Sequence, residues 1–340
     1  MSNRALITGI TGQDGSYLAE LLLDKGYEVY GLARRTSNNP LTRIEHLKDR
    51  VVILRGNMRD IGTLERALKD SKPDEVYNLA AQSDVGVSFE CPEETYEVNY
   101  LGLERLVDAA LCFNSDMRMY QASTSEMFGS VPPPQNEHTP FCPVSPYGKA
   151  KLKAHTRLVE YRTRHKFFIC SGILFNHESP RRGEHFVTRK ITRSLVKIAL
   201  ELQDSFELGN LDARRDWGFA GDYVEAMWKM LQLDTPEDFV IATGRAHTVR
   251  EFVEATARVL DIRITWEGSG VNEVGRDRHN DRVLVRVNPK FYRPAEVYYL
   301  QGDSAKALCM LGWRRKTPFE SLVQMMVEYD YNDLARTMRR

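Results

Sequence analysis

The sequence predicts an α/β fold: a doubly wound parallel sheet followed by a smaller mixed α/β lobe. Strand-like and helix-like segments alternate over the first half of the 340-residue chain, a glycine-rich turn follows the first strand, and the alternation loosens after about residue 175. Strands that alternate with helices at this spacing are typical of βαβ units, whose strands run parallel. We therefore expect domains at 1–175 and 176–340, with some crossing of the chain between them.

Apolar runs predict six strands in the first half, and a period close to 3.6 predicts the helices between them. The third of these helices, for example, repeats apolar residues at Val98, Leu101, Leu106 and Ala110. The strands are expected at about 5–8, 28–33, 51–54, 75–81, 117–122 and 167–173, and the helices at about 16–25, 61–69, 96–112 and 147–164.

In the second half, helices and two short strands are expected around a polar excursion at 268–286, which is expected to be a loop. The helices are expected at 187–202, 223–231, 248–260 and 318–329, and the strands at 206–208 and 239–242.

Composition excludes several classes of protein. Lys plus Arg and Asp plus Glu both number 47, so the chain has no basic excess to favour nucleic acid or a membrane surface. No apolar run is long enough for a membrane span, and the N-terminus does not resemble a signal peptide. The five cysteines and eight histidines have no metal-ligand spacing, so we expect no metal and a reducing, cytoplasmic compartment.

The glycine-rich turn after the first strand predicts dinucleotide binding. The candidate residues there are Gly9, Thr11, Gly12, Gln13, Asp14 and Gly15. Glycines let the backbone approach a pyrophosphate, and the helix that follows offers its free N–H groups to the anion, as in a Rossmann-type domain. An ordinary strand-to-helix turn is the alternative interpretation.

The residues that follow the second strand favour NADP over NAD. Arg34 and Arg35 stand about 20 residues beyond Gly15, where an NAD-binding chain carries an acid. Guanidinium groups bind a 2′-phosphate, whereas a carboxylate repels it. A solvated basic pair on the surface is the alternative.

Two motifs near the fifth and sixth predicted strands suggest redox chemistry on a hydroxyl group. Tyr147 and Lys151 are four residues apart, which places both side chains on one helix face. We expect the ammonium to lower the pKa of Tyr147, so that the phenol can remove a hydroxyl proton. Thr124, Ser125 and Glu126 follow the fifth strand at the edge where such sheets bind ligands.

Glu126 suggests that the reaction includes an elimination step in addition to oxidation. Eliminating water from adjacent carbons needs a group that takes a C–H proton and a group that protonates the leaving hydroxyl, and one carboxylate could do both. A carboxylate that only caps a helix start is the alternative. In the second half, arginine and lysine recur in pairs that suit a diphosphate, although each could be a surface charge.

Together these residues resemble the GDP-mannose 4,6-dehydratases, a family of extended short-chain dehydrogenase/reductases, over nearly the whole chain. The likeness is carried by the stretches at 5–15, 76–83, 120–129, 145–148, 172–180, 215–223 and 293–297. Thr-Ser-Glu at 124–126 also differs from the Asp-Glu pair of dTDP-glucose dehydratases.

The resemblance implies an internal redox reaction on GDP-D-mannose. Tyr147, assisted by Lys151 and Thr124, takes the C4 hydroxyl proton as hydride passes to NADP⁺. Glu126 then removes the C5 proton and helps the C6 hydroxyl leave, and hydride returns to C6 to give the 4-keto-6-deoxy sugar. Dehydration of a related GDP-sugar such as GDP-manno-heptose, nucleotide-sugar epimerisation or reduction, and non-catalytic NADP sensing remain open at this stage.

The resemblance also implies binding residues and an assembly. Cofactor contacts are expected from Asn57, Met58, Leu79, Ala80, Ala81, Ser83, Tyr96, His177 and Arg182, besides the turn, the two arginines, Tyr147 and Lys151. Contacts with the GDP-sugar are expected from Ser83, Thr124, Ser125, Glu126, Asn176, Lys190, Arg215, Arg293 and Glu296. Asn57 replaces the family's usual aspartate beside the adenine. A homodimer or homotetramer is expected, in which the segment near Arg35 reaches a neighbouring subunit's cofactor.

Overall fold

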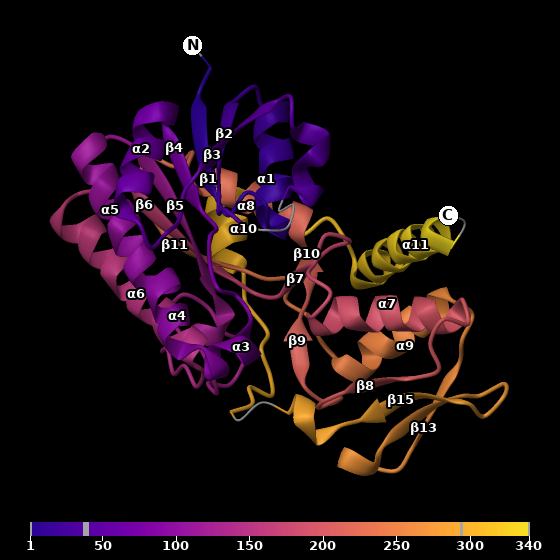
Figure 1. Cartoon of the computed structure of the whole chain (residues 1–340). Coiled ribbons are helices and arrows are strands. Elements are labelled where there is room, and N and C mark those ends of the chain that lie inside the picture. The colour runs from indigo at the N-terminus through magenta and orange to yellow at the C-terminus, as the bar shows by residue number, and fades with distance from the viewer. Residues whose placement is uncertain (1, 37–40, 293–294, 339–340) are drawn as a thin grey trace.

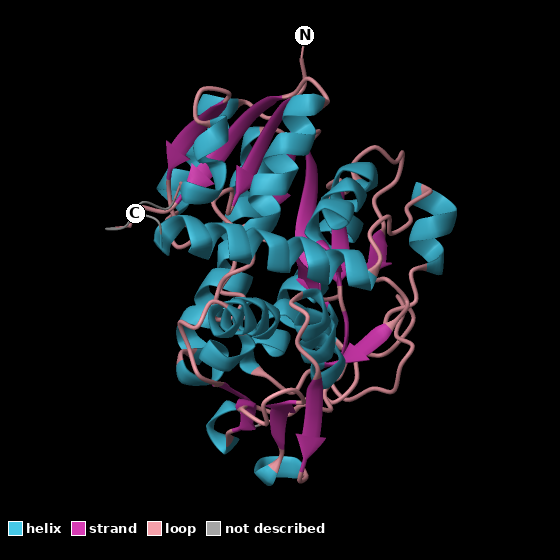
Figure 2. Cartoon of the chain, turned by 90° about the vertical axis from the view of Figure 1, so that its right-hand side faces the viewer, coloured by secondary structure: helices cyan, strands magenta, loops and turns pink. Residues whose placement is uncertain are grey.

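The computed structural model describes residues 2–36, 41–292 and 295–338. Figure 1 shows a larger part, which contains the N-terminus, beside a smaller part formed by the second half of the chain. The larger part is a sheet between two layers of helices, which Figure 2 shows from the side.

The larger part is built on a seven-stranded sheet in the order β11-β6-β5-β4-β1-β2-β3, with every neighbouring pair parallel. This arrangement confirms the predicted doubly wound α/β class. The strands are β1 (Arg4–Thr8), β2 (Glu28–Ala33), β3 (Val51–Arg55), β4 (Glu75–Asn78), β5 (Arg118–Thr124), β6 (Ile169–Leu174) and β11 (Asp238–Ile241).

Two apolar layers bury the faces of this sheet. One contains Leu18, Leu22 and Met227, from helices on one side, and the other contains Leu68, Leu106 and Leu158, from helices on the opposite side. The first side carries α1 (Gln13–Asp24), α8 (Ala220–Met230) and α10 (Ala305–Leu311), and the second carries α2 (Ile61–Ser71), α5 (Gly102–Phe113) and α6 (Pro146–Arg164).

The smaller part packs three helices against a four-stranded sheet of order β13-β14-β15-β8. The helices are α7 (Val187–Ala199), α9 (Val249–Val259) and α11 (Phe319–Met338), and the strands are β8 (Phe206–Leu208), β13 (Ile264–Glu267), β14 (Val274–Asp277) and β15 (Val283–Val287). The expected loop at 268–286 is therefore wrong. Leu284 and Val285 are buried while charged residues occupy the more exposed positions, and these charges hid the strand pattern.

The chain crosses between the two parts. β11 comes from the second half of the chain, yet it completes the sheet of the larger part by pairing with β6. Two short ladders pair β7 (His177–Glu178) with β10 (Gly218–Phe219) and β9 (Arg214–Asp216) with β12 (Ala246–Thr248). They lie between the sheets of the two parts in Figure 1.

The helix expected at 96–112 begins earlier and contains a wide turn. α3 (Val85–Glu90) and α4 (Pro92–Tyr96) precede a π-helical turn at Glu97–Leu101, which continues into α5. Such turns often occur at functional sites. Here the amide of Asn99 exchanges two hydrogen bonds with the backbone of Gln82, at 2.8 and 2.9 Å, and so fixes the loop after β4. The remaining short helical turns are at Thr42–Leu47, Ser125–Met127, Gly270–Asn272 and Pro289–Phe291.

All five cysteines are free thiols, and only Cys170 is buried. In the described part of the chain, no helix combines the length and the apolar character that crossing a bilayer requires.

Candidate active site

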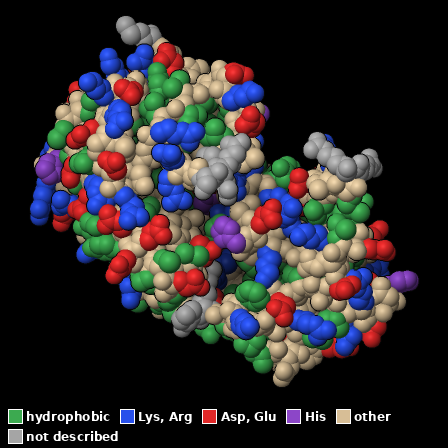
Figure 3. All heavy atoms as spheres, viewed as in Figure 1, with side chains coloured by type: hydrophobic (Ala, Val, Ile, Leu, Met, Phe, Trp, Pro, Cys, Tyr) green, Lys and Arg blue, Asp and Glu red, His purple; other side chains and the backbone are tan. Residues whose placement is uncertain are grey.

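One cleft of about 1130 Å³ runs from the glycine turn, past the carboxyl ends of the central strands, to β8 and β9 of the smaller part. On the face drawn in Figure 3, the surface is hollowed between the two parts, and positive and negative side chains are mixed around it. The cleft therefore joins the regions where the sequence predicts a dinucleotide and a sugar nucleotide.

The glycine turn has a geometry that needs its first glycine. Gly9 has a φ of +69°, and a Cβ there would lie 2.8 Å from the backbone nitrogen of Ala80. Only glycine adopts this conformation readily and lets the two chain segments approach so closely. The turn then opens α1, whose first residues line the cleft. A cradle of this kind fits the pyrophosphate of a dinucleotide.

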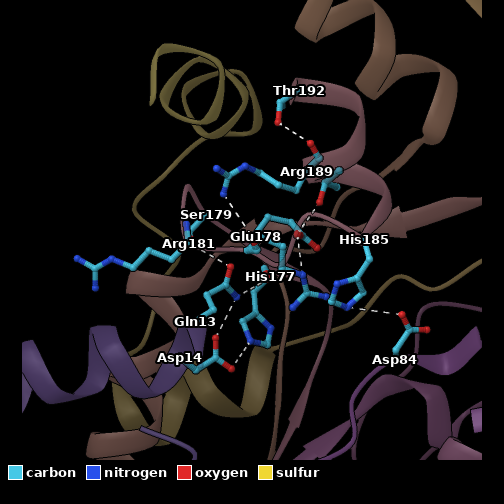
Figure 4. A network of polar contacts seen from close by, with 12 residues as sticks. Gln13, Asp14, Asp84, His177, Glu178, Ser179, Arg181, His185, Arg189 and Thr192 are labelled. Atoms are coloured by element: carbon cyan, nitrogen blue, oxygen red, sulfur yellow. Dashed lines mark hydrogen bonds and ion pairs between the residues drawn. The ribbon is translucent and has the colours of Figure 1, made fainter. Parts of the chain in front are cut away.

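A buried hydrogen-bond network ties the start of α1 to the segment after β6 (Figure 4). His177 Nε2 lies 2.8 Å from Asp14 Oδ2, and its Nδ1 lies 2.7 Å from the carbonyl oxygen of Phe175. Gln13 Nε2 donates to the carbonyl oxygen of His177 at 3.0 Å, while its side-chain oxygen accepts from Ser179 at 2.8 Å. The two segments that line this end of the cleft are thus held at a fixed spacing.

The pair formed by Asp14 and His177 favours charge on both groups. Burial alone would raise the pKa of Asp14, but the imidazole of His177 and the hydrogen bonds at its carboxylate lower the pKa instead. Burial likewise opposes protonation of His177, but Asp14 and the carbonyl of Phe175 raise its pKa above the ordinary value.

Tyr147 and Lys151 both line the cleft from the first turns of α6. Ser145 caps this helix by accepting a hydrogen bond from the N–H of Gly148 at 3.0 Å, and Pro146 suits its first position. The Lys151 ammonium donates to the carbonyl oxygen of Ala122 at 2.8 Å and lies 5.9 Å from the centre of the Tyr147 ring.

The expectation that Lys151 lowers the pKa of Tyr147 is wrong for the polypeptide by itself. Burial raises the pKa of Tyr147 to about 12, although a hydrogen bond with Thr124 opposes this shift. Burial also lowers the pKa of Lys151 to about 8. The ammonium of Lys151 donates its hydrogen bond to the carbonyl of Ala122 rather than to the phenol. Burial is therefore the largest cause of the pKa shifts of both Tyr147 and Lys151.

Glu126 lies beside this pair, in the helical turn that follows β5, and its side chain is buried within the cleft lining. Its N–H donates to the hydroxyl oxygen of Thr124 at 3.2 Å. A Cβ on Gly148 would lie 2.8 Å from the carbonyl oxygen of Glu126. The glycine between Tyr147 and Lys151 therefore allows α6 to approach the Glu126 segment.

At the far end of the cleft, Arg215 on β9 forms an ion pair of 3.3 Å with Glu296. Lys190 on α7 lies over the ring of Phe291 at 3.6 Å, and burial lowers the pKa of this lysine. Asn176 also lines the cleft. Arg293, which the sequence also proposes for this end, lies outside the described residues.

The cleft lining contains nearly all the other residues that the sequence proposes. It includes Thr11, Gly12, Gly15, Arg34, Asn57, Met58, Leu79, Ala80, Ala81, Ser83, Ser125 and Arg182. Arg35 and Tyr96 are not in it. Arg34, directly after β2, therefore lines the cleft, whereas the next residue, Arg35, does not. The hydroxyl of Tyr96 instead accepts a hydrogen bond from Lys153 at 2.6 Å.

Sequence reasoning missed several cleft residues that carry charge or an aromatic ring, among them Arg43, Asp84, His185 and Phe291. No motif marks them, because they come from short helical turns and from loops. His185 Nε2 and Asp84 Oδ2 lie 3.6 Å apart across the cleft (Figure 4). The described residues contain no group of His, Cys, Asp and Glu side chains that could hold a metal ion.

Comparison with known proteins finds a full-length match to one family. The family model described as GDP-mannose 4,6 dehydratase matches residues 6–326. The chain is 54% identical to the GDP-mannose 4,6 dehydratase of Drosophila melanogaster, in an alignment that covers 96% of this chain and 85% of that protein. It is 53% identical to the human protein of that name, covering 98% and 93%, and 48% identical to that of Vibrio cholerae, covering 100% and 96%.

Solved structures with the same fold are more distant in sequence. The UDP-glucose 4-epimerase of Thermus thermophilus, in complex with NAD, matches with a TM-score of 0.81 and 26% identity, covering 96% of this chain and 98% of that one. A dTDP-glucose 4,6-dehydratase from Bacillus anthracis matches with a TM-score of 0.81 and 20% identity, covering 98% of each chain, and this second likeness supports the fold alone.

Proposed function

The chain belongs to the GDP-mannose 4,6-dehydratase family, and on that premise we propose that it converts GDP-D-mannose to GDP-4-keto-6-deoxy-D-mannose with NADP bound throughout. The enzyme is then a hydro-lyase. Its overall reaction removes one water, and the oxidation at C4 is balanced by a reduction at C6.

We propose that residues 1–175 chiefly hold the cofactor and that 176–340 chiefly hold the GDP-sugar. The tight cradle at Gly9 suits a pyrophosphate, and the guanidinium of Arg34 suits the 2′-phosphate that distinguishes NADP. Asn57 and Met58 line the same end and would contact the adenine. The bound dinucleotide supplies the hydride acceptor for C4 and the hydride donor for C6.

Tyr147 is proposed to receive the proton of the C4 hydroxyl, and Thr124 to hydrogen-bond the same oxygen. Only the phenolate form of Tyr147 can accept that proton, and burial, which raises the pKa of the phenol to about 12, opposes this form. Lys151 is fixed by the carbonyl of Ala122 within 5.9 Å of the phenol ring, close enough for its charge to favour the phenolate during the reaction.

Glu126 is proposed to carry out the elimination. Once C4 is a ketone, the C5 proton is acidic, and the carboxylate can remove it to leave an enolate. The same carboxyl group then protonates the C6 hydroxyl, which departs as water while the C5–C6 double bond forms. The Glu126 carboxylate is thereby regenerated. The proton that Tyr147 took from the C4 hydroxyl then goes to C5 as C6 is reduced, which restores the phenolate, so protons balance in each turnover.

At the far end of the cleft, the side chains of Lys190, Arg215 and Glu296 are proposed to hold the guanosine diphosphate. The two cations suit the diphosphate oxygens. Ser83, Ser125 and Asn176 are proposed to contact the sugar, and Arg293 is proposed to join this group.

The placement of Glu126 in the same cleft as Tyr147 and Lys151 carries this proposal. The test is to incubate purified protein with GDP-mannose, without added cofactor, and to follow product mass. We expect loss of one water, and a Glu126→Gln variant that binds substrate without losing water. A product of unchanged mass, which an epimerase would give, would contradict the proposal. Turnover of GDP-manno-heptose in parallel identifies the preferred sugar by kcat/KM.

We also propose a homodimer or homotetramer, supported by the exposed position of Arg35. This arginine does not line its own cleft. An exposed guanidinium outside the cleft is free to reach a neighbouring subunit's cofactor.

A further inference from the structure

Arg43 occupies an unusual position at the cofactor end of the cleft. It lies on the helical turn Thr42–Leu47, which Ile44 and Leu47 anchor in the core against α1. Its side chain is half-buried and lines the cleft. Nε donates to the carbonyl oxygen of Arg181 at 2.7 Å, and Nη1 donates to the carbonyl oxygen of Thr11 at 3.3 Å. The guanidinium thus bridges the glycine turn and the loop after β7.

The neighbouring arginines are neutralised, but Arg43 is not. Arg181 pairs with Glu20 at 2.6 Å, Arg182 lies 3.1 Å from Glu178, and Arg189 pairs with Asp330 at 2.6 Å. Within the part of the chain that the structure describes, Arg43 binds two carbonyl oxygens and forms no ion pair.

The electrostatic surroundings of Arg43 also favour an incoming counter-charge. Burial and the positive charges of Arg189, Arg181 and Arg182 lower its pKa, although it remains a cation at any working pH. A half-buried cation among other cations, open to a cleft, is a ready partner for an anion.

The N–H groups of Arg43 that bind neither carbonyl lie beside the glycine turn. A guanidinium has five N–H groups, and the two carbonyls occupy only part of this set. The contact with Thr11 places the rest beside the glycine turn, and Arg34 lines the same cleft. Resting on the proposed function, we infer that Arg43 binds a phosphate of NADP at this end of the cleft.

The test compares cofactor binding by Arg43→Met with binding by Arg50→Met, in protein freed of bound cofactor. Arg50 is a matched control, because it follows on the same segment, is more than half exposed and lies 4.0 Å from Asp24, outside the cleft. By calorimetric titration, we expect Arg43→Met to weaken NADP binding at least tenfold and Arg50→Met to change it less than twofold.

NAD serves as the second probe. A loss confined to NADP assigns Arg43 to the 2′-phosphate, and an equal loss for NAD assigns it to the pyrophosphate; either result supports the inference. NADP binding as tight in Arg43→Met as in Arg50→Met would overturn it.

The salt dependence of NADP binding distinguishes a direct contact between Arg43 and a phosphate from a purely structural role of Arg43. Removing one phosphate contact should make the slope of log Kd against log salt shallower in Arg43→Met than in wild-type protein, because salt then screens one attraction fewer. Arg43→Lys keeps the charge, so its slope should stay near the wild-type value even if its affinity falls. Equal slopes in all variants would mean that Arg43 acts only through the fold.

The outcome is separable from that of the proposed function. Wild-type protein that makes no dehydrated product would refute the dehydratase proposal while leaving the Arg43 titrations valid. Active wild-type protein with unaltered NADP binding in Arg43→Met would refute only the inference about Arg43.

Discussion

His177 and Asp14 are 163 positions apart in the sequence, yet an imidazole nitrogen and a carboxylate oxygen lie 2.8 Å apart and join the glycine turn to the segment after β6. Both side chains line the cleft, and each raises the tendency of the other to be charged. The cofactor end of the cleft is therefore held by a pair whose strength depends on pH.

This pair gives a prediction about stability. The pKa of His177 is raised by folding, so its contribution is full below the ordinary value of about 6.5 and is lost as pH rises through the folded value. The pKa of Asp14 is lowered, so its contribution is present above about 3.9 and is lost as pH falls through the folded value. The pair is strongest between these two ordinary values.

We expect Asp14→Asn to cost about 1–3 kcal/mol of unfolding free energy near pH 6, and less as pH rises further. Urea unfolding at several pH values measures this difference, with the exposed Asp116→Asn as control. A cost that grows steadily at alkaline pH would contradict the assignment.

Glu126→Gln should reduce formation of the 4-keto-6-deoxy product by about 10²–10⁴-fold, the usual value of a general acid–base group. The amide is nearly isosteric, so GDP-mannose binding should change less than threefold. Mass spectrometry follows the product and calorimetry the binding. Full turnover in this variant would remove Glu126 from the chemistry.

Gly148→Ala should impair catalysis through geometry alone. The added methyl would lie 2.8 Å from the carbonyl oxygen of Glu126, so either α6 or the Glu126 segment must move. We expect kcat to fall at least tenfold while NADP binding is kept. Gly62→Ala on α2 is the control, since its Cβ would make an ordinary contact of 3.5 Å with Asp60 and should leave kcat unchanged.

Lys151→Met should stabilise the protein while it abolishes activity. Burial lowers the pKa of Lys151 to about 8, so holding its charge at neutral pH costs folding free energy. The unfolded chain binds more protons than the folded chain between pH 8 and about 10.4, so the wild type gains stability over that range. The excess stability of Lys151→Met should therefore shrink as pH rises through it, which thermal unfolding at several pH values would detect.

The sequence predicts those parts of the site in which a recognisable local motif stands at a known place relative to a predicted strand. Tyr147 and Lys151 share one face of α6, which follows β5 only after a long loop. The turn at Gly9 and the residues after the fifth strand directly follow parallel strands, whose carboxyl ends share one edge of the sheet. Their meeting in one cleft therefore follows from topology.

Other features depend on tertiary contacts that no local pattern records. Burial, rather than the neighbouring ammonium, decides the pKa of Tyr147. The sequence pattern does not predict β14 and β15, because charged residues occupy their more exposed positions. Arg43 enters the cleft only because the turn that carries it packs against α1, and its sequence context gives no sign of this.

The pairing of β11 with β6 bears on how the protein is made. A nascent chain leaving the ribosome cannot finish its main sheet until residue 241 has emerged, by which time the residues of α7 and β8 of the other part have already emerged. Until then β6 presents an unpaired edge, which invites association with other chains. The last strand of the main sheet is therefore added only after the first elements of the other part have been synthesised.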